Sequence, residues 1–138
     1  MILLIDCDGV LTDGKLTIDH TGQKMFKQFH TRDVRAIREL IYNGYEVVIV
    51  SADDWEGIYH FANKVGASTY ISRDKSDLPY KEYIAIGDDA WDVKMLMNAK
   101  QAYCPLDAHI SVLDLPGIIR LPVKGGQGVI STLLRHII

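Results

Sequence analysis

Short, uninterrupted apolar runs alternate along this sequence with segments of helical periodicity. Residues 2–5, 46–50 and 83–86 are almost entirely apolar, as expected for strands that are covered on both faces of a sheet. Between the first two runs, apolar side chains over residues 34–41 recur at helical spacing. This alternation predicts an α/β fold with a mostly parallel sheet flanked by helices.

Further segments complete the predicted organisation. The chain of 138 residues has the size of one domain, which we expect to span residues 1–138. Two short runs around His20-Thr21-Gly22 predict a β-hairpin over about residues 15–29. The other expected elements are strands at 70–71, 102–104 and 118–121 (the last at an edge), and helices at 55–65, 91–97 and 129–138.

Composition narrows the function classes. The net charge is −3 and no long basic run occurs, so neither nucleic acid nor a membrane surface is an expected partner. With only Cys7 and Cys104, the chain lacks the cysteine content of a disulfide-built secreted domain. The apolar start reaches Asp6 after five residues, too few for a signal-peptide core or a membrane span. We therefore expect a cytoplasmic protein.

Reactive side chains follow three of the predicted strands. Asp6 and Asp8 come after the first, Ser51 after the second, and Asp88 and Asp89 after the strand at 83–86. In a parallel sheet the carboxyl ends of all strands lie on one edge, where ligands bind. The sequence therefore predicts that these residues gather in a single crevice.

The segment Asp6-Cys7-Asp8-Gly9 places two carboxylates close together at a turn. Such a pair does not ionise jointly unless a cation lies between the groups or one of them carries a proton. Mg²⁺ favours carboxylate and carbonyl oxygens, and a protonatable carboxyl group serves as general acid and then base. A solvated turn with two acidic residues is the plain alternative.

A second acidic cluster, Asp88 and Asp89 with Asp92 one turn later, also has two interpretations. It is either the capping group of a helix that starts near residue 90 or the second half of a cation site. Ser51 is either a phosphoryl-binding hydroxyl or an ordinary strand end, and Lys75 either a phosphate-neutralising cation or a solvated lysine.

The string D-C-D-G-V-L-T-D-G from Asp6 to Gly14, followed in order by Ser51, Lys75 and G-D-D, resembles the haloacid dehalogenase (HAD) superfamily of aspartyl phosphatases. The hairpin, the segment F-H-T-R-D and the glycine-rich residues 125–129 resemble one branch in particular. That branch contains 3-deoxy-D-manno-octulosonate 8-phosphate phosphatase and related nonulosonate 9-phosphate phosphatases. The similarity extends over nearly the whole chain.

The resemblance implies a Rossmann-like sheet without a large cap domain. It also implies a magnesium-dependent phosphomonoester hydrolase that acts on a small phosphorylated sugar acid. It implies a homotetramer in which the hairpin acts as a flap and a neighbouring subunit helps to close each site. Its implied roles are nucleophile for Asp6 and acid–base for Asp8. The implied metal residues are Asp6, Asp8, Asp88, Asp89 and Asp92, with Asp8 binding through its carbonyl and either Asp89 or Asp92 orienting metal-bound water. The implied substrate-binding residues are Arg32, Asp33, Ser51, Ala52 and Lys75; Arg32 and Asp33 also suit the start of a helix.

The chain departs from this pattern at three places, the first being Val34 after F-H-T-R-D, where relatives usually have glycine. Ser51-Ala52-Asp53 stands where relatives often have Thr-Gly-Arg, so an anion-binding arginine is missing. Only residues 76–82 separate Lys75 from the next strand, and they include Pro79. Relatives normally place a helix in this interval, so we expect one face of the sheet to be thinner here.

Two other classes of function compete with the phosphatase. A receiver-type signalling module shares the length, the acidic strand ends, the hydroxyl and the lysine. It carries its phospho-acceptor on a middle strand, however, where this chain has Ser51. A non-catalytic assembly subunit of the same fold is the other alternative, although the acidic set is complete. Cys7 lacks the following arginine that cysteine phosphatases use, so we interpret it as a spacer.

Overall fold

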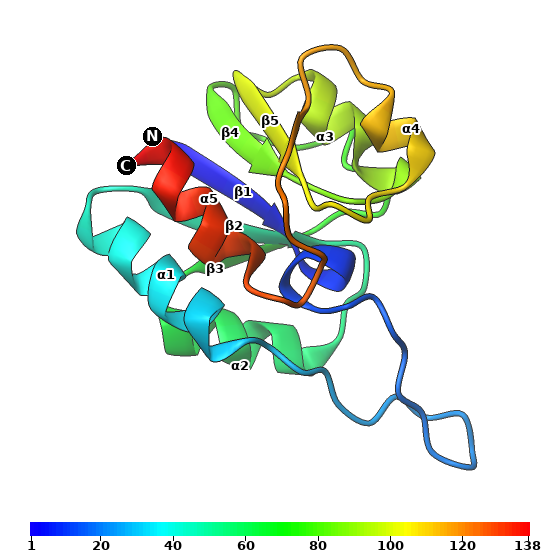
Figure 1. Cartoon of the computed structure of the whole chain (residues 1–138). Coiled ribbons are helices and arrows are strands. Elements are labelled where there is room, and N and C mark those ends of the chain that lie inside the picture. Colours follow the sequence, from blue (N-terminus) through cyan, green and yellow to red (C-terminus); the bar gives the residue numbers. More distant parts are fainter.

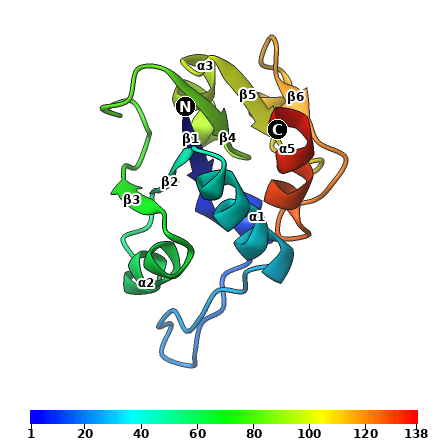
Figure 2. The same cartoon turned by 90° about the vertical axis from the view of Figure 1, so that its left-hand side faces the viewer.

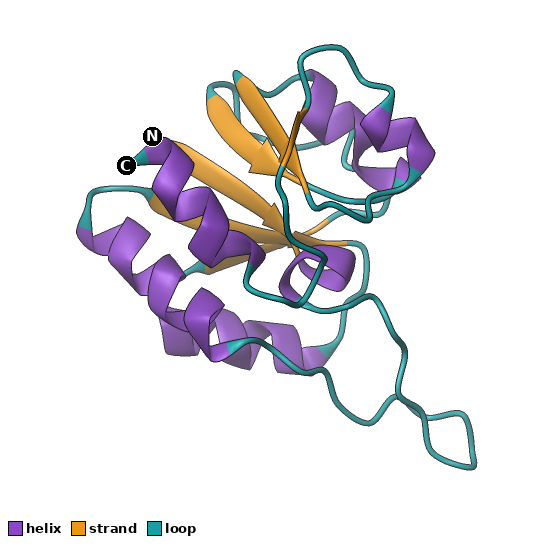
Figure 3. Ribbon diagram, in the orientation of Figure 1, coloured by secondary structure: helices purple, strands orange, loops and turns teal.

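The computed structural model describes residues 1–138 and contains one sheet of six parallel strands (Figures 1 and 3). Their order across the sheet is β3-β2-β1-β4-β5-β6. The predicted α/β class is therefore confirmed. The strands are β1 (Ile2–Asp6), β2 (Glu46–Ser51), β3 (Ser68–Ile71), β4 (Tyr83–Ile86), β5 (Gln101–Cys104) and β6 (Ile119–Arg120).

Strand order reverses at β1, which lies between β2 and β4. Crossover connections on either side of such a point diverge to opposite faces and leave a crevice beyond the carboxyl ends of the strands. Asp6 and Ser51 are the last residues of β1 and β2, and Asp88 lies two residues beyond β4. The topology thus brings the reactive strand ends to one place.

Helices cover the two faces of the sheet unequally. The larger core, with 21 buried apolar residues, lies under α1 (Thr31–Tyr42), α2 (Glu56–Val65) and α5 (Val129–Ile137). Figure 2 shows α1 and α5 side by side over this face. The smaller core has 10 buried residues and lies under α3 (Val93–Met97) and α4 (Ile110–Leu113).

Residues 76–82 form no helix, as the short interval before β4 predicts. Leu78 and Tyr80 are half-buried against the smaller core instead. The ring of Tyr80 meets that of Tyr70 edge-on, with centroids 6.0 Å apart. Two side chains of an irregular loop therefore cover a part of the sheet for which the sequence provides no helix.

The hairpin is less regular than its sequence predicts. One antiparallel bridge joins Ile18 to Lys24, and Met25 N–H donates to the Thr17 carbonyl at 2.9 Å. The rest of the segment is irregular and projects from the body of the molecule (Figure 3). A two-stranded ribbon without a third strand to pack against is marginal in water, which accounts for the missing strands.

Several helix boundaries differ from the predicted ones. α1 begins at Thr31 because the His30 side chain accepts a hydrogen bond from Arg32 N–H at 3.1 Å and caps the helix. The expected helix at 91–97 is a 3₁₀ turn (Ala90–Asp92) followed by α3, and the four-residue α4 was not predicted. No helix is both long and apolar enough for a bilayer crossing.

Two residues of α5 differ in burial, so we expect their substitution to affect stability differently. Leu133 is fully buried, whereas Arg135 is exposed on the same helix. We expect Leu133→Ala to lower the free energy of unfolding by about 2–5 kcal/mol, because it leaves a cavity against α1 and the sheet. Arg135→Ala should change it by no more than about 0.5 kcal/mol. Urea denaturation followed by circular dichroism measures both; equal effects would contradict the assigned core.

Candidate active site

A hollow of about 380 Å³ lies beyond the carboxyl ends of the central strands. Its lining is dominated by charge: six carboxylates and two cations surround it. The structure thus brings together all of the predicted residues except Arg32 and Asp33. The lining residues are Asp6, Asp8, Ser51, Ala52, Asp53, Arg73, Lys75, Asp88, Asp89, Trp91 and Asp92.

The turn after β1 lets two acidic strand ends approach each other. Gly9 has a φ of +87°, a left-handed conformation that side chains rarely adopt. A Cβ atom at this position would lie only 1.7 Å from Oδ2 of Asp88. Glycine is therefore required at position 9 for two reasons. The turn needs the left-handed conformation, and Asp88 occupies the space beside Asp6 that a Cβ atom would take.

Lys75 is the central cation of the hollow. Its side chain is 1% exposed, and its Nζ donates to Asp6 Oδ1 at 2.5 Å and also to Asp92 Oδ1. The residue has a φ of 55°, and its N–H donates to Ser72 Oγ at 3.1 Å. Although burial lowers the pKa of Lys75, the charges of Asp6 and Asp92 outweigh this and raise it, so the side chain is an ammonium ion.

Asp92 and Asp89 make different hydrogen bonds in the turn that follows β4. Asp92 Oδ2 accepts hydrogen bonds from the N–H groups of Asp88 and Asp89 at 2.9 and 3.1 Å, which fixes the turn. The exposed Asp89 caps the following 3₁₀ turn by accepting from Ala90 N–H at 2.7 Å. The capping interpretation therefore applies to Asp89, whereas Asp88 faces Asp6.

Asp6, Asp88 and Asp92 form a cluster that fits a hard divalent cation. One carboxylate oxygen from each lies within 4.8 Å of the others. Oδ1 of Asp88 is buried and has no hydrogen-bond partner. Burial and then the neighbouring Asp6 raise the pKa of Asp88 to about 10, and burial and then Asp92 raise that of Asp6 to about 7. A divalent cation would relieve this crowding of carboxylates, and oxygen ligands are those that Mg²⁺ prefers.

Asp8 is held by a residue that sequence reasoning missed. Lys27 of the hairpin donates to Oδ1 and Oδ2 of Asp8 at 2.9 and 2.8 Å. Lys27 also approaches Asp53 Oδ2 at 3.3 Å, and Lys24 pairs with the same carboxylate. An alternation of charged and apolar residues in a hairpin does not reveal that one lysine folds back onto a residue 19 positions earlier.

The remaining rim is formed after β2 and β3. Ser51 is buried, and its Oγ accepts from Asp53 N–H at 3.1 Å and donates to the Asp53 carbonyl at 3.0 Å. Ala52 is exposed beside it. Arg73, which the sequence analysis did not select, lines the hollow from the loop after β3 and is exposed. It places a guanidinium at the hollow although Asp53 stands where relatives often have arginine.

Arg32 and Asp33 lie outside this hollow. Asp33 is fully buried, and its Oδ1 accepts from Ser131 N–H at 3.0 Å at the start of α5. Arg32 lines a separate surface hollow between α1 and α5, together with Arg35 and Glu39. Within this chain, Asp33 therefore joins α1 to α5, and neither residue reaches the acidic cluster.

The glycine-rich segment at 125–128 supports the turn after β1 from behind. Gly126 N–H donates to the Val10 carbonyl at 3.0 Å. A Cβ atom on Gly125 would lie 2.0 Å from the carbonyl oxygen of Gly9, so the two backbones are in direct contact. The C-terminal segment thus braces the first acidic motif without lining the hollow itself.

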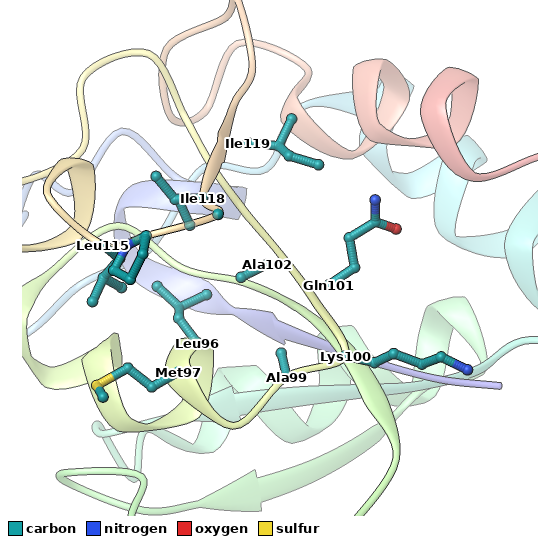
Figure 4. A pocket seen from close by; sticks show the side chains of 11 residues that line it. Leu96, Met97, Ala99, Lys100, Gln101, Ala102, Leu115, Ile118 and Ile119 are labelled. Carbon is teal, nitrogen blue, oxygen red and sulfur yellow. The ribbon is translucent and has the colours of Figure 1, made fainter.

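A second hollow, of about 300 Å³, lies at the opposite ends of the edge strands (Figure 4). Mostly apolar side chains surround it, including Leu96, Leu115 and Ile118. Lys100 is the one charged residue of its lining. Because its lining contains no carboxylate and a single ionisable group, Lys100, the acidic hollow is the candidate active site.

Curated proteins of known name resemble the chain along most of its length. The 3-deoxy-D-manno-octulosonate 8-phosphate phosphatase of Yersinia pestis is 28% identical over 142 residues, which covers 94% of this chain and 74% of that protein. The N-acylneuraminate cytidylyltransferase of Oncorhynchus mykiss is 29% identical over 128 residues, or 82% of this chain. That match spans only 29% of the cytidylyltransferase. No family model matches the sequence.

Solved structures share the fold. A Legionella pneumophila hydrolase assigned to the HAD superfamily is 27% identical with a TM-score of 0.86, covering 97% of this chain and 79% of that one. The cobalt-bound octulosonate 8-phosphate phosphatase of Haemophilus influenzae is 24% identical with a TM-score of 0.87, covering 99% and 85%. The Moraxella catarrhalis octulosonate phosphatase, in complex with magnesium, phosphate and KDO, is 22% identical with a TM-score of 0.84, covering 99% and 84%. The resemblance to the HAD superfamily and its octulosonate phosphatase branch is confirmed.

The position of Gly9 predicts a selective loss of metal binding. Gly9→Ala adds a methyl group where Asp88 Oδ2 lies, so we expect magnesium affinity to fall at least about tenfold. Gly22→Ala is the matched control, because Gly22 has a similar φ of +84° but nothing within 4 Å of the added atom. Isothermal titration with MgCl₂ compares the two; equal affinities would contradict the assigned role of Gly9.

The crowded carboxylates predict how stability depends on pH. A carboxyl group whose pKa is raised on folding binds more protons in the folded chain, so stability falls as pH rises from the unfolded pKa toward the folded one. With Asp6 raised to about 7 and Asp88 to about 10, the metal-free protein should melt at lower temperature at about pH 9 than at about pH 5.

A divalent cation such as Mg²⁺ should reverse this loss, because it would bind the ionised carboxylates. Asp88→Asn should flatten the pH dependence and remove the response to magnesium, whereas Asp114→Asn, an exposed residue outside the site, should alter neither. Calorimetric melting curves with and without MgCl₂ measure both effects. A wild-type melting temperature that rises steadily over this range without metal would overturn the assignment.

Proposed function

We propose that this chain, a phosphatase that resembles the octulosonate phosphatase branch of the HAD superfamily, uses a divalent metal and hydrolyses a phosphorylated sugar acid through an aspartyl-phosphate on Asp6. The observation that carries the proposal is the grouping of Asp6, Lys75 and Asp88 at the reversal of strand order. A nucleophilic carboxylate, a buried cation and an unpartnered metal-ligand oxygen are the parts that phosphoryl transfer needs.

Asp6 and Asp8 share the first half of the proposed reaction. A carboxylate oxygen of Asp6 forms a bond to phosphorus while the bond from phosphorus to the sugar oxygen breaks. Asp8 gives its proton to that departing oxygen, so the sugar leaves as a neutral alcohol. Lys75 and the hydroxyl of Ser51 stabilise the charge on the transferring phosphoryl oxygens. Ala52 lines the same rim of the hollow.

Asp8 then acts in the opposite direction. Its carboxylate takes a proton from a water molecule, whose oxygen attacks phosphorus and breaks the bond to Asp6. Inorganic phosphate is released, Asp6 returns to its carboxylate form, and Asp8 is protonated again. The chain therefore ends the cycle as it began, with one water consumed per monoester.

Asp6, Asp88 and the backbone carbonyl of Asp8 are the proposed ligands of a magnesium ion. Such an ion supplies positive charge that holds Asp6 ionised and offsets the charge of the phosphoryl group. Asp92, whose oxygens are engaged by Lys75 and two backbone N–H groups, holds the ligand-bearing turn in place. Asp89 is exposed at the rim and suits the role of orienting metal-bound water.

Two features support the finer choice of substrate and assembly. The Yersinia pestis and Haemophilus influenzae relatives are named as octulosonate 8-phosphate phosphatases, which supports a phosphorylated sugar acid as the substrate. The hairpin exposes four large apolar side chains, at Leu16, Ile18, Met25 and Phe26. Exposed apolar surface of this kind marks an interaction site, which supports a homotetramer whose hairpins pack together. We place the enzyme in the cytoplasm.

Phosphate release from a panel of monoesters tests the proposal. The panel contains octulosonate and nonulosonate phosphates, hexose phosphates, nucleotides and an aryl phosphate. We expect magnesium-dependent release, fastest with a sugar-acid phosphate, and a loss of about three orders of magnitude or more in Asp6→Asn, which removes the nucleophile. Asp114→Asn is the matched control and should retain full activity. Release that persists in Asp6→Asn, or none from folded wild type with magnesium, would overturn the proposal.

A further inference from the structure

Lys27 occupies an unusual environment for a lysine in an exposed hairpin. Its side chain is 6% exposed, although the hairpin projects from the body of the molecule (Figure 3). Its Nζ donates to both oxygens of Asp8, at 2.9 and 2.8 Å, and lies 5.3 Å from the ring centre of Trp55. The ammonium is thus held by a bidentate carboxylate and an aromatic face at the same time.

The two contacts of Lys27 with Asp8 are shorter than its contact with Asp53. Asp53 is the other carboxylate within reach, at 3.3 Å, but Lys24 already pairs with the same Asp53 oxygen. An exposed lysine–carboxylate pair is loosely held and contributes little, because both side chains remain mobile and solvated. A nearly buried ammonium with two short bonds to one carboxylate instead restricts the orientation of that carboxylate.

We propose that Lys27 is the positioning residue for Asp8, holding its carboxylate toward the leaving group and stabilising the charge that remains there once the proton has moved. The assignment rests on the proposed function, in which Asp8 protonates the departing oxygen. As the P–O bond breaks and the proton passes to that oxygen, Asp8 becomes an anion beside the Lys27 ammonium. In the second half, the same contact orients Asp8 to accept a proton from water.

Because Lys27 belongs to the hairpin, this role makes proton transfer by Asp8 depend on the position of the hairpin. Lys27 lies on the returning arm of the hairpin, one residue after Phe26, so Asp8 is oriented only when that arm lies against the site. Its effect should depend on the leaving group. A sugar alkoxide is a poor leaving group and needs the proton from Asp8, whereas p-nitrophenolate departs without one.

The test compares two substrates in the magnesium-loaded full chain. For Lys27→Met we expect kcat/KM for octulosonate 8-phosphate to fall about 10- to 100-fold, part of the 10²- to 10⁴-fold that general acid catalysis supplies. For p-nitrophenyl phosphate the loss should stay within about threefold. Lys27→Arg, which keeps the charge and the bidentate geometry, should restore most of the sugar-phosphate rate.

Lys15→Met is the matched control, since it removes a hairpin lysine that is 85% exposed and pairs with Asp13 rather than with Asp8. It should change the rates for both substrates by the same small factor. Lys27→Gln gives a second neutral variant, in case Lys27→Met does not fold, and should show the same selective loss. Melting curves verify that the compared variants are folded.

Equal losses on both substrates in the folded neutral variants would overturn the role of Lys27, as would no loss on either. These outcomes differ from a failure of the proposed function. In that case wild type would release phosphate from neither substrate, and the assignment of Lys27 would fall with it.

Discussion

The ammonium of Lys75 is the interaction on which the site depends. It joins Asp6 at the end of β1 to Asp92 after β4, and it comes from the loop after β3, so one buried cation connects three strand ends. Breaking one partner of such a buried group leaves an uncompensated charge and costs far more than a surface pair. Asp92 in turn holds the turn that carries Asp88. The positions of the proposed nucleophile, the cation and the proposed metal-ligand carboxylate are therefore set together.

The backbone packing around this interaction leaves little freedom. Gly9 lets Asp88 approach the turn after β1, and the glycine-rich segment at 125–128 closes on that turn from the other side. The regular sheet and larger core thus hold the proposed catalytic groups in place, while the hairpin that carries Lys27 is held by few backbone hydrogen bonds. The groups proposed to bind the phosphoryl group are therefore rigid, whereas the arm proposed to lie near the leaving group is less regular. This difference fits an enzyme whose substrate selectivity comes from segments outside the sheet.

Much of this arrangement could be predicted from sequence because it follows from strand polarity. Apolar runs ending in Asp6, Ser51 and Asp88 gave both the parallel sheet and the crevice. The sequence could not show which of Asp88 and Asp89 caps the following turn and which faces Asp6. Helix capping and cation binding both favour an aspartate at this kind of turn. The role of Lys27 could not be predicted, because its contact with Asp8 depends on how the hairpin folds back onto the site. Asp33 was selected for its motif, although its carboxylate serves the start of α5.

Detection of the covalent intermediate on Asp6 tests the central claim most directly. The magnesium-loaded enzyme would be quenched in acid during turnover of octulosonate 8-phosphate, and the peptide containing Asp6 analysed by mass spectrometry, with borohydride reduction of a parallel sample. We expect a phosphorylated Asp6 that borohydride converts to homoserine, and no adduct in Asp6→Asn. Turnover with an adduct on another residue, or with no adduct at any quench time, would contradict this claim.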